Sequence, residues 1–431
     1  MKKNLVKMLG TSLVLVLALS MVACGGAKGS SVKKDKITIS LWHIWPDSTT
    51  GDGKIIQDFI AKYEAEHPNV DIISDASETE SYKAKLKIAF SGGETPDVFF
   101  TYGAGFLKPF VDSGRVQAMD EVLDSATRAR LLPGTEANFL YDGKLYGLPI
   151  KMWAGVLYCN KELFQQAGLE YPETWDMLLK AIETFRARGI QPLCCGGKDA
   201  WHPAMYHDIL AVREAGIDGV NAAMAGKKRF DDPEFLKAAN DFYTIVKKNG
   251  FNDGFAGQGA QEAQAEFLMG RIPMYFNGSW LTGDIQNPEN QVKDKIVAVS
   301  FPSVPGGKGD RTTFTGGAID GYGVSKESKN LKVAVDVMAS LAEYQSLASY
   351  LSGDGISVWK GEVDESKLNP VLKQINDLLK SGTGYCLAWD TQLSGADIDT
   401  YLSAIQDLQG AGKTPKAYVE HLQNKLSIAK K

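Results

Sequence analysis

The order of strand-like and helix-like patterns along the chain predicts an α/β protein with two interwoven lobes. Short apolar runs are separated by longer stretches in which apolar residues recur with the period of a helix. The chain has 431 residues, and because domains average roughly 150 residues, two or three of them fit with ample cores. Alternation and length together therefore predict more than one α/β unit.

The first elements set out this alternation. Residues 37–42 place Ile37, Ile39 and Leu41 on one face of a strand. Residues 70–73 predict a second strand, and residues 82–90 predict a helix that ends at Gly92-Gly93. Between the two strands lies a helical apolar stripe that Pro68 prevents from continuing, made of Ile55, Ile56, Phe59, Ile60 and Tyr63.

Aromatic residues gather where the first strand ends. Trp42, His43 and Trp45 fall at its carboxyl end. In open α/β sheets the carboxyl ends of the strands face the ligand crevice. We therefore predict that Trp42 and His43 contact a ligand.

The stretch 144–161 is the organising segment of the chain. It follows a turn signal, Asp142-Gly143, in which glycine supplies a positive φ without steric cost. Pro149 disfavours helix at the preceding residue, and residues 156–159 are apolar and few enough to form a buried strand. Trp153 lies in the middle, where a core strand would more comfortably carry Val or Ile.

The later elements follow the same alternation. Thr174 is a suitable N-cap for a helix whose buried stripe includes Trp175. Residues 261–270 predict a helix closed by a glycine, residues 272–276 a strand, and residues 277–280 a turn at its end that carries Trp280. A helix is expected over about 331–351, and a turn over 410–415 precedes the last helix. Trp201 fits either the core or the edge of a pocket.

The N-terminus carries a targeting pattern. Basic residues precede a short apolar core over 13–19, which is too short for a convincing membrane span. The sequence Val22-Ala23-Cys24 resembles the bacterial lipobox, which implies cleavage before Cys24 and lipidation of its sulfur. We expect a signal peptide over 1–23, and residues 24–35, which lack an apolar face, are expected to form a flexible tether.

Charge and composition exclude several classes of function. The net charge is −5, so no global basic field favours nucleic acid. The remaining cysteines (Cys159, Cys194, Cys195 and Cys386) and the five histidines show no spacing typical of a zinc site or a redox pair, and we interpret these cysteines as structural. No nucleophile elbow, Walker A or dinucleotide motif is present. We expect no cofactor and no metal.

Three motifs resemble the large carbohydrate-binding family of extracellular solute-binding proteins of ABC importers. The stretch 148–161 resembles the family's pattern of Leu-Pro followed later by Tyr-Asn-Lys, with Cys159 where the motif has Tyr. Residues 93–98 resemble its GxxPDV strand, and residues 267–280 its helix–strand–Trp pattern. The resemblance covers nearly the whole chain from Ile37 to Ala429.

The resemblance implies a type II periplasmic-binding-protein-like fold with a ligand cleft between the lobes and extra C-terminal helices. It implies an N-terminal lobe of residues 36–149 and 312–355 and a C-terminal lobe of residues 150–311 and 356–431. It also implies sugar contacts from several aromatic and acidic residues, since an indole can cover the apolar face of a sugar ring. Besides Trp42 and His43, these predicted ligand contacts are Tyr102, Trp153, Trp280, Asp320, Trp389 and Asp390.

The leading hypothesis is therefore a non-enzymatic binding protein. It captures a carbohydrate, with the number of aromatic residues favouring an oligosaccharide, and delivers it to the transmembrane subunits of an ABC permease. We expect a lipid-anchored, extracytoplasmic monomer with no nucleic-acid partner. Two alternatives remain, the same fold binding a non-sugar solute and a secreted glycoside hydrolase, which would need two carboxylates at a defined separation.

Overall fold

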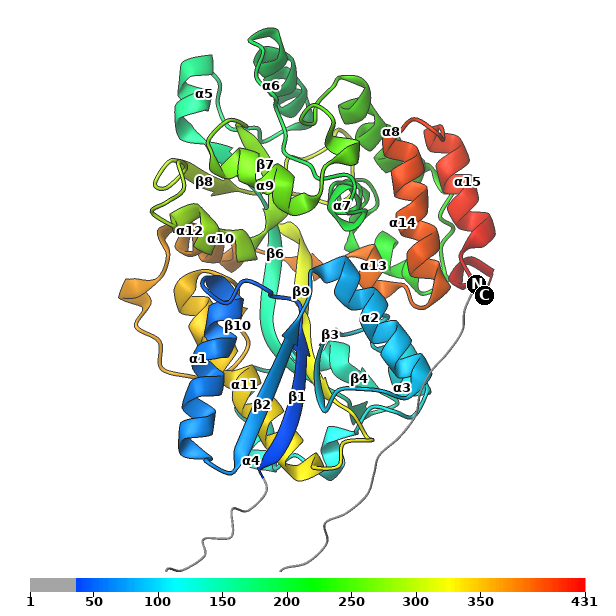
Figure 1. The fold of residues 1–431 in the computed structure, drawn as a ribbon. Coiled ribbons are helices and arrows are strands. Elements are labelled where there is room, and N and C mark those ends of the chain that lie inside the picture. Colours follow the sequence, from blue (N-terminus) through cyan, green and yellow to red (C-terminus); the bar gives the residue numbers. More distant parts are fainter. Residues whose placement is uncertain (1–35, 431) are drawn as a thin grey trace, which may run out of the picture. The chain divides into compact units, whose positions relative to one another are not determined.

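The computed structural model describes residues 36–430, so the predicted signal peptide, the tether and Cys24 lie outside the described residues. The described chain is α/β, as the sequence predicts (Figure 1). Its main sheet has nine strands in the order β10-β6-β9-β3-β1-β2, with β7 and β8 paired to β6 and β11 paired to β9. Across residues 36–430, no helix is long and apolar enough to cross a membrane.

The first three strands and two helices confirm the predicted alternation. β1 (Ile37–His43) pairs in parallel with β2 (Val70–Ala76) and with β3 (Val98–Tyr102). α1 (Gly51–Glu66) buries the predicted apolar stripe, and α2 (Thr79–Gly92) ends at Gly93, whose φ of 80° only glycine adopts easily. Pro68 follows α1 two residues after its end, as expected.

A hairpin stands at the predicted Asp142-Gly143 turn. β4 (Leu140–Tyr141) and β5 (Lys144–Leu145) pair antiparallel across it. Asp142 has φ 49° and Gly143 has φ 79°, and positive φ at both central residues is the geometry of a tight hairpin turn. The short helices before it are α3 (Lys108–Asp112) and α4 (Ser125–Arg128).

Two long strands, β6 (Leu148–Asn160) and β9 (Thr313–Val324), form the middle of the sheet and run side by side in Figure 1. The first part of β6 pairs with β9 and with β10 (Ile356–Ser357), and β9 pairs with β3. The second part of β6 pairs with β7 (Met274–Gly278) and β8 (Ile296–Val299), while the start of β9 pairs with β11 (Gly384–Cys386). The same two strands therefore serve two groups of neighbours.

A group of helices lies between β6 and β9 along the chain. α6 (Trp175–Ala187) begins as predicted, since Thr174 Oγ1 accepts a hydrogen bond from the Met177 backbone N–H at 3.4 Å, and Trp175 is buried. α7 (Trp201–Met224) is interrupted at Gly216, which has φ 72°. The others are α5 (Lys161–Ala167), α8 (Pro233–Lys247), α9 (Ala260–Leu268) and α10 (Thr282–Gln286).

The remaining helices follow β9. α11 (Leu331–Ser352) matches the predicted helix and contacts α1 and β6. Then come α12 (Pro370–Lys380), α13 (Trp389–Gln392), α14 (Ala396–Gln409) and α15 (Pro415–Lys425), the last after the predicted turn. Single turns of 3-10 helix are η1 (Met119–Glu121), η2 (Ala137–Phe139), η3 (Phe255–Gly257), η4 (Ser279–Leu281), η5 (Glu365–Lys367) and η6 (Ile428–Lys430).

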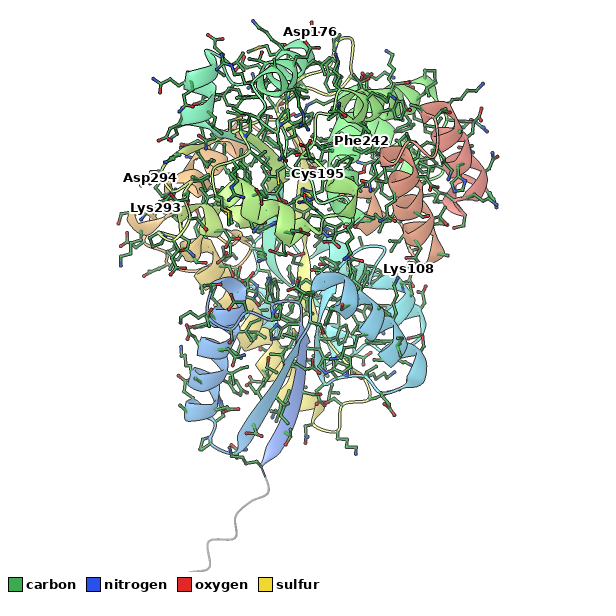
Figure 2. The ribbon with its side chains drawn as sticks, turned by 45° about the horizontal axis from the view of Figure 1, so that its top comes forward. Lys108, Asp176, Cys195, Phe242, Lys293 and Asp294 are labelled. Carbon is green, nitrogen blue, oxygen red and sulfur yellow. The ribbon has the colours of Figure 1, made fainter. Side chains whose placement is uncertain are left out.

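Apolar side chains fill the space between the sheet and the helices. Cys195 and Phe242 lie among these packed side chains in Figure 2, whereas Asp176 and Lys108 are exposed at the periphery. All four cysteines within residues 36–430 are buried and unpaired, and burial raises the pKa of Cys159 above its ordinary value. A buried thiol of raised pKa is unreactive, which agrees with a structural role.

Candidate functional site

The pairing of β6 with β9 brings two of the predicted ligand residues, Trp153 and Asp320, into one stretch of the sheet. Lys151 pairs with Asp320, and Trp153 pairs with Gly317. Gly316 permits this close approach, because a Cβ there would lie 2.1 Å from the Trp153 carbonyl oxygen. Residues from the two long strands thus share one region of the sheet, which we call the candidate site.

One part of the site, the polar side, consists of Tyr102, Asp320, Asp390 and Lys83. Tyr102 on β3 is paired in register with Asp320 on β9. Burial raises the pKa of Tyr102, and the nearby carboxylates of Asp320, Glu80 and Asp390 raise it further. Lys83 Nζ lies 5.3 Å from the centre of the Tyr102 ring.

The two aspartates of the polar side have raised pKa values. Burial raises the pKa of Asp320 to about 6, against the opposing effect of the Lys151 ammonium. Burial likewise raises the pKa of Asp390 to about 6, with Lys83 opposing. Both carboxylates are therefore ionised at neutral pH and are able to accept hydrogen bonds from ligand hydroxyl groups.

The other part, the tryptophan side, consists of Trp153, Trp201 and Trp280. The rings of Trp153 and Trp280 meet edge to face with centroids 5.0 Å apart, and those of Trp201 and Trp280 are 6.4 Å apart. Trp153 is buried, while Trp201 and Trp280 are partly exposed. The cluster offers aromatic faces and edges to a ligand at its exposed end.

Local backbone features hold Trp280 in this cluster. A Cβ at Gly278 would lie 2.0 Å from the Trp280 ring, so the glycine is what lets the indole fold over the end of β7. Ser279 Oγ accepts a hydrogen bond from the Ala154 backbone N–H at 3.2 Å, which ties this turn to β6 beside Trp153. The Asn-Gly-Ser-Trp turn predicted from the sequence thus places its tryptophan against another predicted ligand residue.

Two residues at the site were not among the predicted contacts. Trp201 begins α7 and completes the tryptophan side. Trp45 follows β1, and its ring packs on Phe100 with centroids 5.0 Å apart and lies 5.1 Å from Lys151 Nζ. Its place at the carboxyl end of the first strand was the available signal, and that signal applied to Trp45 as well as to Trp42 and His43.

His43 and Trp42 lie on opposite faces of β1. His43 is 1% exposed, its Nε2 is 2.7 Å from Ser74 Oγ, and its Nδ1 accepts a hydrogen bond from the Trp45 backbone N–H. Burial lowers the pKa of His43 to about 4, so the ring is neutral. Trp42 lies under Lys85 Nζ, 3.8 Å from the ring centre. His43 therefore supports the loop that carries Trp45, and the Trp42 ring has the Lys85 ammonium as its neighbour.

The structure separates the adjacent residues Trp389 and Asp390. Trp389 is fully buried in an aromatic cluster of the helices, with Phe230, Phe235 and Tyr401 as neighbours. Asp390, one position further on α13, belongs with Tyr102. This geometry supports a site role for Asp390 and a core role for Trp389.

A surface cavity of about 330 Å³ lies elsewhere, against α1, β2 and α11. Its lining includes Tyr63, whose hydroxyl donates to Asp336 at 2.6 Å, and His67. None of the predicted ligand residues lines it. Within residues 36–430, no three His, Cys, Asp or Glu side chains are grouped so as to hold a metal ion.

Similar proteins share both sequence and fold with this chain. The "Multiple sugar-binding protein" of Streptococcus mutans is 26% identical over 362 residues, which cover 81% of this chain and 82% of that protein. A structure described for xylan utilization by the thermophilic bacterium Caldanaerobius polysaccharolyticus is 37% identical, with a TM-score of 0.87, and the match covers 91% of this chain and all of the other. A "Chitin oligosaccharide binding protein" is 27% identical, with a TM-score of 0.84 and coverage of 92% and 99%.

The family assignment follows from a match over most of the chain. Residues 46–345 fit the model of the bacterial extracellular solute-binding proteins, and this range includes β6, β7, β9 and the tryptophan side. The predicted resemblance is thereby confirmed. The chain belongs to the bacterial extracellular solute-binding protein family.

Proposed function

We propose that this protein captures an oligosaccharide and delivers it to an ABC permease. The observation that supports the proposal is the pairing of β6 with β9, in which Trp153 of the tryptophan side and Asp320 of the polar side belong to the same stretch of the sheet. A sugar ring has an apolar face of C–H groups and a rim of hydroxyl groups. Aromatic faces cover the first, and carboxylates and hydroxyls accept or donate to the second.

The relatives support a sugar as the ligand. The Streptococcus mutans relative is named for binding multiple sugars, and the two similar structures are described for xylan utilization and for chitin oligosaccharides. At 37% identity, the first of these structures favours xylo-oligosaccharides as the first compounds to test. Chito-oligosaccharides follow for the same reason.

A thermal-shift screen over a sugar panel tests the proposal. The panel contains xylose, chitobiose and oligomers of both, with maltose and raffinose as further members. At a ligand concentration of about 100 times Kd, binding adds about 2.7 kcal/mol to the free energy of unfolding. A Trp280→Ala variant is the matched control, because it lacks one of the two partly exposed rings of the tryptophan side. Stabilisation of neither protein by any sugar would contradict the proposal.

Two alternatives are distinguished by simple measurements. A non-sugar solute of strong charge usually needs bidentate partners such as arginine, and a panel of amino acids and polyamines tests for one. A glycoside hydrolase needs paired carboxylates, and release of chromophore from chromogenic xylosides or chitobiosides by the purified protein would favour it. We propose that the protein is not an enzyme, so no release is expected.

We further propose that ligand closes two lobes about hinges near residues 148–150 and 300–315. The lobes comprise residues 36–149 with 312–355 and residues 150–311 with 356–431. The first boundary falls inside β6 and the second just before β9. Closure would therefore bend β6 and β9, the two long strands that pair with both groups of neighbours. Small-angle scattering with and without the sugar should show a smaller radius of gyration in the complex, and an unchanged radius at saturation would exclude closure.

The location is proposed from the N-terminal sequence. Lipidation of Cys24 would hold the protein at the cell membrane outside the cytoplasm as a monomer, close to the permease. Two acyl chains are expected to hold stably, whereas one chain holds only marginally. Cys24→Ala should release the protein from membranes, and equal membrane retention of variant and wild type would rule out the anchor.

A further inference from the structure

Lys151 is a buried lysine in the first part of β6, where it is 3% exposed. Lysines are almost never fully buried unless they are paired, because an isolated ammonium loses its hydration. Lys151 Nζ forms an ion pair with the carboxylate of Asp52 at the start of α1. It also donates a hydrogen bond of 3.0 Å to the backbone carbonyl oxygen of Asp354, after α11.

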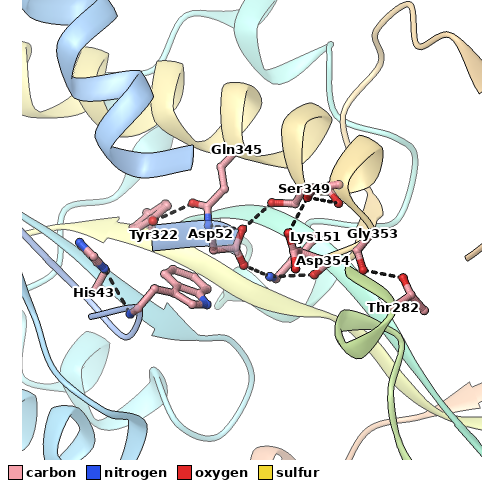
Figure 3. Close-up of polar contacts among 11 residues, drawn as sticks. His43, Asp52, Lys151, Thr282, Tyr322, Gln345, Ser349, Gly353 and Asp354 are labelled. Atoms are coloured by element: carbon pink, nitrogen blue, oxygen red, sulfur yellow. Dashed lines mark hydrogen bonds and ion pairs between the residues drawn. The ribbon is translucent and has the colours of Figure 1, made fainter. Parts of the chain in front are cut away.

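Asp52 is fixed in turn by α11. Gln345 Nε2 donates to Asp52 Oδ1 at 3.0 Å, and Ser349 Oγ donates to the same oxygen. The Tyr322 hydroxyl on β9 donates to Gln345 Oε1 at 2.7 Å. Figure 3 shows this network around the Lys151 ammonium. Because α1, α11 and β9 all contribute, the position of the ammonium is fixed by the fold.

The remaining neighbours of this ammonium belong to the candidate site. Lys151 Nζ lies 5.1 Å from the centre of the Trp45 ring, within the range of roughly 6 Å for a cation–π contact. Lys151 is also the residue paired with Asp320 across β6 and β9. One buried charge therefore touches an aromatic ring and lies beside a carboxylate of the site.

We propose that Lys151 is a positioning residue for sugar binding, whose ammonium holds the Trp45 ring and supplies the positive charge beside the Asp320 carboxylate. This inference rests on the proposed function. Lys151 acts from behind the site, since its Nζ is already occupied by Asp52 and Asp354. The role goes beyond stabilising the fold, because it sets the state of a group that accepts ligand hydrogen bonds.

The charged groups that influence Asp320 are Lys151 on β6 and Asp52 on α1. Asp320 in turn raises the pKa of two tyrosines beside it, Tyr102 on β3 and Tyr322 on β9. Burial raises the pKa of Asp320 to about 6, Lys151 lowers it, and Asp52 raises it. Loss of the ammonium therefore raises the pKa of Asp320 further, so that near neutral pH a larger fraction of the group is protonated and has lost part of its acceptor capacity.

The test measures the affinity for xylotetraose and chitotetraose by calorimetry from pH 5 to pH 9. Lys151→Met removes the charge and keeps most of the apolar stem. Lys151→Met/Asp52→Asn removes both charges of the buried pair. Because no unpaired charge then remains in the interior, this variant should fold even if Lys151→Met does not. Lys54→Met is the matched control on α1, since Lys54 pairs with Asp58 at the surface.

The wild-type protein should lose affinity as the pH falls through about 6, because Asp320 becomes protonated. In Lys151→Met this loss should shift to higher pH by about one unit, with partial recovery of affinity toward pH 9. The double variant should show a smaller shift in the same direction, because Lys151 affects Asp320 more than Asp52 does. Lys54→Met should follow the wild-type curve.

A different pattern would overturn the inference. An equal loss of affinity at every pH, or a pH profile that stays at the wild-type position, would make Lys151 a purely structural residue. If the wild-type protein binds neither tetrasaccharide but binds another sugar of the panel, the same pH series is measured with that sugar. A wild-type protein that binds no sugar refutes the proposed function, and this role of Lys151 with it.

Discussion

The polar side and the tryptophan side of the candidate site are held in place by different forces. Behind the polar side lies the buried pair of Lys151 and Asp52, with hydrogen bonds from α11. The tryptophan side has ring contacts and a glycine that leaves room for an indole. The first arrangement depends on charge and hence on pH, whereas the second depends on shape. In a binding protein that has both arrangements, the orientation of the ligand and its contact area with the protein are controlled by different residues.

The largest effect should come from breaking the buried pair. Lys151→Ala leaves Asp52 charged and unpaired in the interior, and we expect the free energy of unfolding to fall by about 3–5 kcal/mol. Chemical denaturation of the unliganded protein measures this. Lys54→Ala, which breaks a surface pair, should cost less than about 1 kcal/mol. Equal losses in the two variants would show that the buried pair does not hold the polar side.

The next effect concerns the pH dependence of stability. The pKa of Asp320 is raised from its ordinary value of 3.8 to about 6 in the folded protein. The stability that this group contributes is therefore present below about pH 4 and is lost as the pH rises through about 6. Two pKa units correspond to at most roughly 3 kcal/mol.

Asp320→Asn should remove that loss, so its stability should fall less than that of the wild type between pH 4 and pH 7. Unfolding midpoints of the unliganded proteins across this range provide the measurement. Trp280→Ala should keep the wild-type pH dependence, because the tryptophan side carries no titrating group of its own. A wild-type slope in Asp320→Asn would assign the pH dependence to other carboxyl groups.

A smaller effect, on sugar affinity, should distinguish Trp280 from Trp389. We expect Trp280→Ala to weaken sugar binding by about 1–3 kcal/mol, the scale of a lost large apolar contact. Trp389→Ala, in the helical core, should cost about 3–5 kcal/mol of stability and leave affinity unchanged where the protein is folded. Calorimetry and thermal unfolding of both variants give the two quantities. A reversed pattern would place the ligand at Trp389.

The smallest effect is expected at the hydroxyl of Tyr102. Tyr102→Phe keeps the ring beside Lys83 and removes one hydrogen-bonding group from the polar side. Affinity should fall by about 0.5–1.5 kcal/mol, the typical contribution of one hydrogen bond. Sugars that lack a single hydroxyl, tested against both proteins, would identify the group it meets. Identical affinities of Tyr102→Phe and wild type for all sugars would remove Tyr102 from the contact set.

Local signals predicted much of the fold. The capping role of Thr174, the positive φ at Gly93 and the Asp142-Gly143 turn all depend on residues close in sequence, and the structure confirms each. The family motifs extended this to the fold type. The β6–β9 pairing was beyond local patterns, because it joins segments far apart in the chain.

The site was harder to predict, because exposure is a property of the packed chain. Trp280 ends a predicted turn, and Trp389 begins a short helix. Yet Trp280 is partly exposed, whereas Trp389 is enclosed by helices. The pair of Lys151 and Asp52 gave no signal at all, since each is a single charged residue in an otherwise ordinary stretch. Trp45 was visible at the end of β1, but the sequence did not distinguish it from His43, which turned out to support its loop.

The two shared strands also have a consequence for how the chain folds. Leu148 pairs with Tyr322, so the centre of the sheet stays incomplete until β9 has emerged during synthesis or export. Until then the first part of β6, which is almost wholly apolar and buried in the finished protein, has open edges that another chain could pair with. Contacts between such distant segments also slow folding. Shortened chains that end before residue 313 should therefore aggregate, and assembly of the fold depends on keeping the early strands apart until their late partner arrives.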